Sequence, residues 1–192
     1  MLKILTQQRK RRINPLMIRE SSVVTEVITP ERQRQQKVEA FRNRNSYEGK
    51  SLIDYSLKLL SELAKIKEIS PGAFFISEMR ENKQILRFLS AYAAPGPDNI
   101  DLILELGEGF PGQVAKEGKL ISISDVPQGY LTIESGLGKA NPVSLIIFPV
   151  KHNDKVLAVI ELASFRTFTR EDEIFFEEIS SSIADQILKL IG

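Results

Sequence analysis

The chain has 192 residues, 42% of them hydrophobic, which is enough for one domain with a real core and an additional arm. It contains no cysteine, which excludes a disulfide framework, a thiol nucleophile and a thiolate metal site and suits a reducing cytoplasm. The net charge of +1 conceals an asymmetry, because residues 1–50 hold 12 Lys and Arg against 5 Asp and Glu, and the remainder holds 14 against 20. A basic arm therefore precedes an acidic globule. No apolar run approaches the ~18 residues of a membrane helix, so we expect a cytoplasmic protein without a membrane span.

Residues 1–49 are predicted to form the basic arm and an entry helix. The cluster RKRR (9–12) has three interpretations: contact with nucleic-acid phosphates, contact with anionic lipid, or a solvated flexible terminus. We do not expect nucleic-acid binding. Residues 21–28 could form a short strand. Thr29-Pro30 is a helix-start signal, and the residues that follow are helix-prone and polar nearly all round.

Residues 51–66 carry apolar side chains at helical spacing and predict an amphipathic helix. GAFFISEM (72–79) and ILRFLSAYA (85–93) then predict a hairpin with a longer polar loop. In its second strand, alternation places four side chains on one face, namely Leu86, Phe88, Ser90 and Tyr92. PGP (95–97) breaks the chain, and Asp98 or Asn99 can cap a short helix through Leu104.

Residues 104–165 combine a glycine-rich bend, a short strand, a long polar loop and two apolar runs. Asn153-Asp154 lies between these runs as a two-residue hairpin signal. The arrangement predicts a sheet covered by a loop, which is the anatomy of a small-molecule pocket. The final segment begins with Thr169 and Asp172, a capping box, and continues as an amphipathic helix.

The predicted fold class is α+β, with an antiparallel sheet of five to six strands. Short connections favour antiparallel pairing. The N- and C-terminal helices should pack on one sheet face, because each must bury an apolar stripe. The loops 94–118 and 125–142 are left to cover the other face.

Two motifs are judged to carry no chemistry. Gly107–Gly112 spells GxGxxG, but Pro111 interrupts it, only residues 113–117 precede the next glycine, and no second βαβ unit follows, so dinucleotide binding is rejected. His152 is the single histidine and adjoins a turn. We therefore expect no metal site, no catalytic residue and no enzyme activity.

Glu161 is the least expected residue in an apolar strand, since alternation puts it on the same face as Leu157, Val159 and Ala163. A carboxylate there is costly unless partnered. It could bind a ligand or hydrogen-bond the covering loop, or it could reach water or a basic side chain. The polar loop residues Tyr130, Ser135 and Asn141 have two interpretations, ligand binding or ordinary turn chemistry.

The run GEGFPGQVAKEGK, ISISDVP, GYLTIESGLGKANPVSLIIFPVKHNDKVLAVIELASF and FTREDEIFFEEISSSIADQI resembles a GAF domain, of the kind found in bacterial sensor and signal-transduction proteins. The likeness covers about residues 50–191, and the GAF domain is assigned to 50–192. It implies a PAS-related sheet with a pocket on the face away from the helices, allosteric sensing of small molecules, and dimerisation through the helices.

The sequence departs from particular GAF subfamilies. Cyclic-nucleotide-binding members carry Asn-Lys, then Phe and Asp-Glu; here Phe168, Asp172 and Glu173 are present, but Ser164-Phe165 stands where Asn-Lys is expected. Cyanobacterial bilin-binding members and free methionine sulfoxide reductases of this fold use cysteines, which this chain lacks. The resemblance therefore does not identify a cofactor.

We predict a regulatory domain that binds an unknown small molecule and acts by rearranging the terminal helices of a homodimer, with a possible signalling partner. The alternative is a degenerate scaffold without ligand, plugged by its own bulky side chains and used for dimerisation or partner assembly. The candidate ligand-binding residues are Phe75, Ser77, Tyr92, Phe110, Tyr130, Ser135, Leu145, Ile147 and Glu161.

Overall fold

The computed structural model describes residues 29–67, 72–93, 102–135 and 138–192. These contain the helices α1 (Pro30–Arg44), α2 (Leu52–Lys67), α3 (Gly109–Glu117) and α4 (Arg170–Ile191). The strands are β1 (Gly72–Arg80), β2 (Lys83–Tyr92), β3 (Ile103–Glu105), β4 (Ile121–Ile123), β5 (Ile133–Ser135), β6 (Gly138–Ala140), β7 (Ser144–His152) and β8 (Lys155–Ser164). The basic cluster 9–12, the strand expected at 21–28, the break at 95–97 and the helix start at Asp98 or Asn99 lie outside the described residues.

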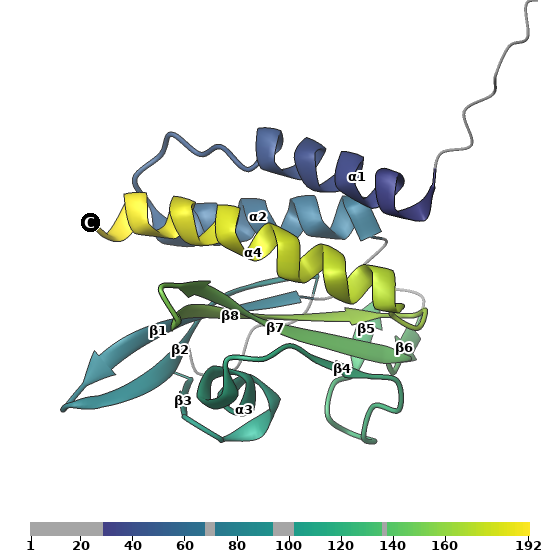
Figure 1. The fold of residues 1–192 in the computed structure, drawn as a ribbon. Coiled ribbons are helices and arrows are strands. Elements are labelled where there is room, and N and C mark those ends of the chain that lie inside the picture. Colours follow the sequence, from purple (N-terminus) through teal and green to yellow (C-terminus); the bar gives the residue numbers. More distant parts are fainter. Residues whose placement is uncertain (1–28, 68–71, 94–101, 136–137) are drawn as a thin grey trace, which may run out of the picture.

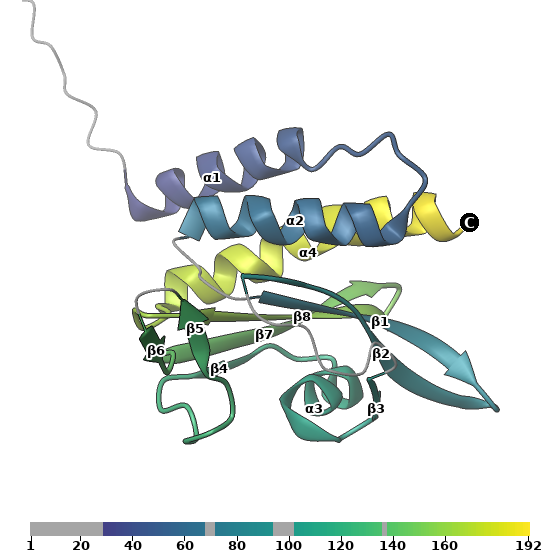
Figure 2. The same ribbon diagram turned by 180° about the vertical axis from the view of Figure 1, so that it is seen from behind.

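A six-stranded sheet in the order β3-β2-β1-β8-β7-β4 forms the centre of the fold, and each of its recorded pairings is antiparallel. Helices α2 and α4 lie side by side on one face, with α1 outside them, and α3 lies on the opposite face with the loops (Figures 1 and 2). The predicted fold class and the shared face for the terminal helices are confirmed. The layered arrangement follows from the stripes of α2 and α4, whose apolar residues are buried against the sheet.

The start of α4 shows why the chain turns sharply after β8. Thr169 Oγ1 accepts a hydrogen bond from the Asp172 backbone amide, and the Asp172 carboxylate accepts one from the Thr169 amide, so the predicted capping box is present. Arg166 adds an ion pair to the same carboxylate at 2.9 Å. The helix then brings Phe175 and Phe176 directly onto the sheet, where both are fully buried.

Helix α1 is attached by polar contacts and by a small apolar contact, in which the Phe41 ring meets Phe175 of α4 with centroids 6.4 Å apart. It buries only Val38 and Phe41. Arg34 Nη1 lies 2.6 Å from Glu171 of α4, and Arg42 donates to the Glu178 carbonyl of α4 at 3.2 Å. The prediction of a helix after Thr29-Pro30 that is polar nearly all round is confirmed, and these contacts attach it to α4.

Several short elements differ from the sequence predictions. The loop between β1 and β2 is a tight two-residue turn at Glu81-Asn82, both with positive φ, rather than a longer loop. Residues 103–105 form strand β3 and not the end of a helix, because they pair with β2. The loop over 125–142 contains the small β5–β6 hairpin. The turn at Asn153-Asp154 is confirmed, with φ values of 48° and 63°.

The glycine-rich bend contains a longer helix than predicted, since α3 begins at Gly109 and includes Pro111 in its first turn. The surrounding sheet is antiparallel, so the rejection of a dinucleotide-binding crossover still holds. Gly107 and Gly109 have φ values of 95° and 61°, as expected for glycines that turn the backbone. Gly112 is required for a different reason, because a Cβ there would lie 2.5 Å from the Glu105 carbonyl oxygen.

Replacing Gly112 with alanine is expected to destabilise the domain by about 1–3 kcal/mol, because α3 must move away from β3 to relieve this overlap. Chemical denaturation of the variant measures the effect. Lys116→Ala on the exposed side of the same helix is the control and should change stability by less than about 0.5 kcal/mol. Equal stabilities for the two variants would contradict the close packing of α3 on β3.

Candidate functional site

The sheet face opposite α2 and α4 carries an apolar surface, which we call the open face. Its buried residues come from four strands and from α3: Phe75, Leu86, Leu145, Ile147, Val156, Val159, Ala163, Val114 and Ala115. Around them lie half-buried apolar side chains that include Ala73, Phe88, Phe110, Ile123, Val126 and Leu131. The strands supply alternate residues to this face, which is why Ile147 and Val159 lie on it while Ile146 and Ile160 lie in the helix-side core.

Glu161 projects from β8 into this apolar surface. Its register partners are Ala73 on β1 and Ile147 on β7, so it has an apolar residue on each side in the sheet. The side chain is half-buried. Burial raises the pKa of Glu161 from 4.5 to about 7, and a hydrogen bond from Tyr130 opposes only part of this rise.

The Tyr130 hydroxyl donates that hydrogen bond to Glu161 Oε2 at 3.2 Å. Tyr130 lies in the loop after β4, so of the alternatives left open for Glu161 the structure shows the hydrogen bond to the covering loop. Burial and the neighbouring Glu161 charge raise the pKa of Tyr130 above its ordinary value, and the phenol remains a proton donor.

Two aromatic rings form a roof beside this carboxyl group. The Phe110 and Tyr130 rings have centroids 4.9 Å apart and planes at 53°. Phe110 comes from the first turn of α3, so the glycine-rich bend and the covering loop meet here. This site offers a carboxylate, a phenol and two aromatic rings beside an apolar floor. Such a set can hold a small molecule that combines a polar group with an apolar body.

The structure brings six of the nine predicted ligand-binding residues together on the open face: Phe75, Phe110, Tyr130, Leu145, Ile147 and Glu161. Ser77 lies at the far end of β1, where its hydroxyl accepts from Gln84 Nε2 at 2.8 Å. It lines a groove of about 550 Å³ near the hairpin turns, which reaches the open-face residues Ala115 and Val156. The side chain of Ser135 lies outside the described residues. Ligand binding by these residues stays a prediction.

Tyr92 is placed on the other face, where it packs against the helix-side core. The cause is a β-bulge: Phe74 pairs with Ser90 and Phe75 pairs with Phe88, so Leu89 has no partner. The bulge reverses the alternation, and Ser90 Oγ meets Ser56 Oγ of α2 at 2.6 Å. The interpretation that Leu86, Phe88, Ser90 and Tyr92 share one face is therefore wrong.

Sequence reasoning also missed residues of the open face. Ala73 lies directly beside Glu161 across the β1–β8 pairing, and Phe88 packs on Phe75 with ring centroids 5.8 Å apart. Alternation with Phe75 is a signal that could have found Ala73. Phe88 was correctly assigned to the same face as Leu86 but was not selected as a candidate.

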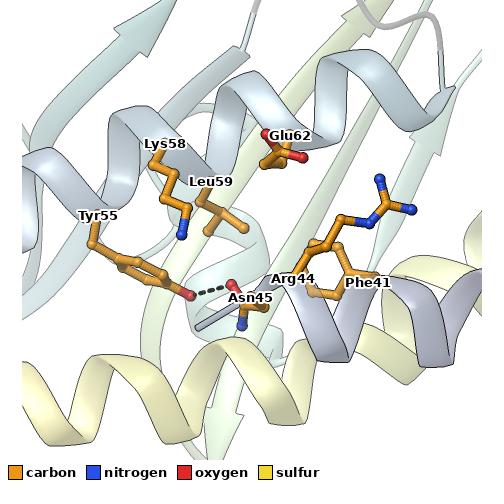
Figure 3. Close-up of a pocket in the computed structure, with 7 residues that line it drawn as sticks. All are labelled: Phe41, Arg44, Asn45, Tyr55, Lys58, Leu59 and Glu62. Carbon is orange, nitrogen blue, oxygen red and sulfur yellow. Dashed lines mark hydrogen bonds between the residues drawn. The ribbon is translucent and has the colours of Figure 1, made fainter. Parts of the chain in front are cut away.

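Other hollows in the described part of the chain offer less. Between α1 and α2 a cavity of about 10 Å³ is lined by Phe41, Arg44, Asn45, Tyr55, Lys58, Leu59 and Glu62 (Figure 3). Tyr55 donates to Asn45 Oδ1 there at 2.9 Å, and the volume admits a water molecule at most. A surface groove of about 460 Å³ runs between α4 and the β4–β7 edge, and Lys119, Lys151 and Glu177 give it mixed charge.

No group of three His, Cys, Asp or Glu side chains that could hold a metal ion occurs among the described residues. His152 is exposed at the end of β7. None of the described helices is both long and apolar enough to cross a bilayer.

Comparisons with known proteins agree with this architecture. A family model described as GAF domain matches residues 50–187. The chain is similar to a Coxiella burnetii structure, the GAF domain of a phosphoenolpyruvate-protein phosphotransferase, with 14% identity, 81% of this chain and 93% of that chain covered, and a TM-score of 0.65. It is also similar to an A. aeolicus GAF domain in an inactive state, with 20% identity, coverages of 84% and 99%, and a TM-score of 0.60.

A third similar structure is an enzyme, free methionine-R-sulfoxide reductase from Neisseria meningitidis in complex with its substrate. Its identity is 14%, the coverages are 82% and 89%, and the TM-score is 0.61. At these identities the structural likeness shows the fold alone. No curated protein sequence matches the chain significantly. The family match covers most of the sequence and coincides with the sheet, α2 and α4, and on this basis the chain belongs to the GAF-domain family.

Proposed function

We propose that this protein is a regulatory GAF domain that binds a small molecule on the open face as part of a bacterial, cytoplasmic signal-transduction protein. The observation that carries the proposal is the Tyr130–Glu161 hydrogen bond, with the Phe110 ring packed against the Tyr130 ring. Burial makes the ionised carboxyl costly, and such perturbed groups cluster at functional sites. The neighbouring apolar floor supplies the hydrophobic contact that small-molecule sites use.

The proposed output is a shift of the helix layer. Strands β7 and β8 carry open-face residues such as Ile147 and, at alternate positions, helix-side residues such as Ile146 and Phe148. Ser180 of α4 donates to the Pro149 carbonyl of β7 at 2.9 Å, so the helix is tied to a strand that floors the site. Displacement of this strand by a ligand would move α4 and thereby change the packing of a homodimer through the terminal helices. Coupling of this kind is typically about 1–3 kcal/mol.

We propose no enzymatic activity. Structural neighbours include reductases, but those of this fold are expected to use cysteines, and this chain has none. The residues assembled on the open face provide binding groups and no nucleophile paired with a base.

A metabolite screen by thermal unfolding tests the sensing proposal. A ligand at a hundred times its Kd adds about 2.7 kcal/mol, which should raise the Tm by roughly 5–10 °C for a domain of this size. Tyr130→Ala should reduce the shift, because it removes one ring and the donor to Glu161. The matched control is Tyr92→Ala, which changes a tyrosine on the opposite face and should leave the ligand-induced shift intact.

The second candidate function is a scaffold without ligand, used for dimerisation or partner assembly. It is favoured by the filling of the open face, where Leu145, Ile147 and Val159 are fully buried. The absence of any shift with nucleotides, amino acids and tetrapyrroles, together with a stable dimer by light scattering, would favour this candidate over sensing.

A further inference from the structure

Glu161 has unused hydrogen-bonding capacity. Within the described residues, the recorded partner of its carboxylate is the Tyr130 hydroxyl on Oε2, and no ion pair is recorded for it. An ionised carboxylate offers about four acceptor positions. Because the flanking residues on β1 and β7 are Ala73 and Ile147, the neighbouring strands supply no side-chain donor at these positions.

The chemistry of these neighbours restricts what could complete the site. A second carboxylate or a phosphate on the ligand would repel Glu161 and would bind only while Glu161 carries a proton. A metal ion would need further ligands, and the described residues hold no cluster of three ligating side chains. A group that donates hydrogen bonds and carries positive charge satisfies the carboxylate and offsets the cost of its burial.

The aromatic rings of Phe110 and Tyr130 add a second preference for positive charge on the ligand. Ring faces attract cations because of their quadrupole. The half-buried side chains of Ala73, Ile123 and Leu131 belong to the same apolar cluster and can contact a hydrocarbon portion of the ligand. Charge at one end and hydrocarbon at the other describe a small amphiphilic amine.

We propose that the open face takes a ligand with a protonated amine or amidinium group on a small apolar body, with Glu161 as its counter-ion and Tyr130 as the residue that orients the carboxylate. This inference rests on the proposed sensing function and narrows it to one ligand class. Glu161 accepts from the ligand on the carboxylate positions left free by Tyr130, and no covalent step is involved.

Three probes of equal length test the class: pentylamine, pentan-1-ol and pentanoate. Binding is followed by chemical-shift changes of backbone amides in β8 and β7 of the intact chain. The titrations run at about pH 8, where a group with a pKa of about 7 is mostly ionised. Pentylamine is expected to bind about tenfold more tightly than pentan-1-ol, in line with a charge-assisted hydrogen bond, and pentanoate most weakly.

Glu161→Gln keeps the shape and an acceptor for Tyr130 but removes the charge, so the amine preference should fall to within about twofold of the alcohol. Glu177→Gln, on the exposed side of α4, is the matched control and should retain the preference. Equal binding of the three probes, tighter binding of pentanoate, or no binding of any probe to the wild type overturns the inference.

The metabolite screen distinguishes a failure of the amine inference from a failure of the sensing proposal. A metabolite that raises the Tm equally in wild type and in Glu161→Gln would refute the amine inference and leave sensing intact. If no metabolite binds, sensing itself is refuted.

Discussion

Replacing Phe176 with alanine is expected to destabilise the protein by about 3–5 kcal/mol, the range for removal of a buried phenylalanine ring. Phe176 is fully buried and contacts three other rings. It stacks on Phe148 of β7 with centroids 5.1 Å apart, and it meets Phe168 and Phe175 edge to face at 6.1 and 5.4 Å. The ring therefore joins α4 to the sheet, and its loss leaves a cavity that three rigid neighbours cannot fill.

The measurement is urea denaturation of the variant beside wild type. Phe165→Ala removes the same ring from the surface, where half of the side chain is exposed, and should cost less than about 1 kcal/mol. Similar losses for both variants would show that the aromatic cluster under α4 does not anchor the helix.

The second large effect is expected in the pH dependence of stability. The pKa of Glu161 in the folded protein is raised from 4.5 to about 7, so folding favours the protonated form. The contribution of Glu161 to the free energy of unfolding is fully present below about pH 4. It falls as the pH rises from the pKa of the unfolded chain, 4.5, to the pKa in the folded protein, about 7. At about 1.4 kcal/mol per pKa unit, the loss between about pH 4 and pH 8 is about 3 kcal/mol.

Glu161→Gln should lack this loss, because its amide does not titrate. The free energy of unfolding of wild type minus that of the variant should therefore decrease by about 3 kcal/mol as pH rises across the interval. Other carboxylates contribute equally to both proteins and cancel. The group that faces Glu161 in the described structure, Tyr130, remains protonated throughout. If the difference in free energy of unfolding between wild type and Glu161→Gln stays constant with pH, Glu161 is well solvated in the folded protein.

The long elements could be predicted from the sequence because their signals are local and repeated. Apolar runs bounded by turn signals mark β1, β7 and β8, and the apolar stripe of α4 continues along the whole helix. Alternation within β8 correctly placed Glu161 on the face of Val159 and Ala163. The prediction that Leu157 shares this face is wrong, because the β7–β8 register shifts at Leu157 and this side chain packs against the helix-side core.

The remaining features depend on contacts between distant segments. Strands β3 and β4 have three residues each, too few for a period, and exist because β2 and β7 offer hydrogen bonds. The bulge at Leu89 is a property of the β1–β2 pairing, and neither strand alone shows it, which is why Tyr92 was assigned to the wrong face. The meeting of Phe110 with Tyr130 joins α3 to a loop 20 positions later, which no local pattern encodes.

The contacts that hold α1 on α4 should make its attachment sensitive to salt. Its ties to the rest of the fold are guanidinium contacts with α4, which dissolved ions weaken, and the burial of only two apolar side chains, Val38 and Phe41. The layers beneath are held by far more extensive burial, which dissolved ions do not weaken. Detaching this helix should therefore be a low-energy opening that precedes global unfolding and shows as fast amide exchange confined to residues 30–44. A binding partner that competes for Glu171 and Glu178 could release the helix while the sheet and its site stay assembled.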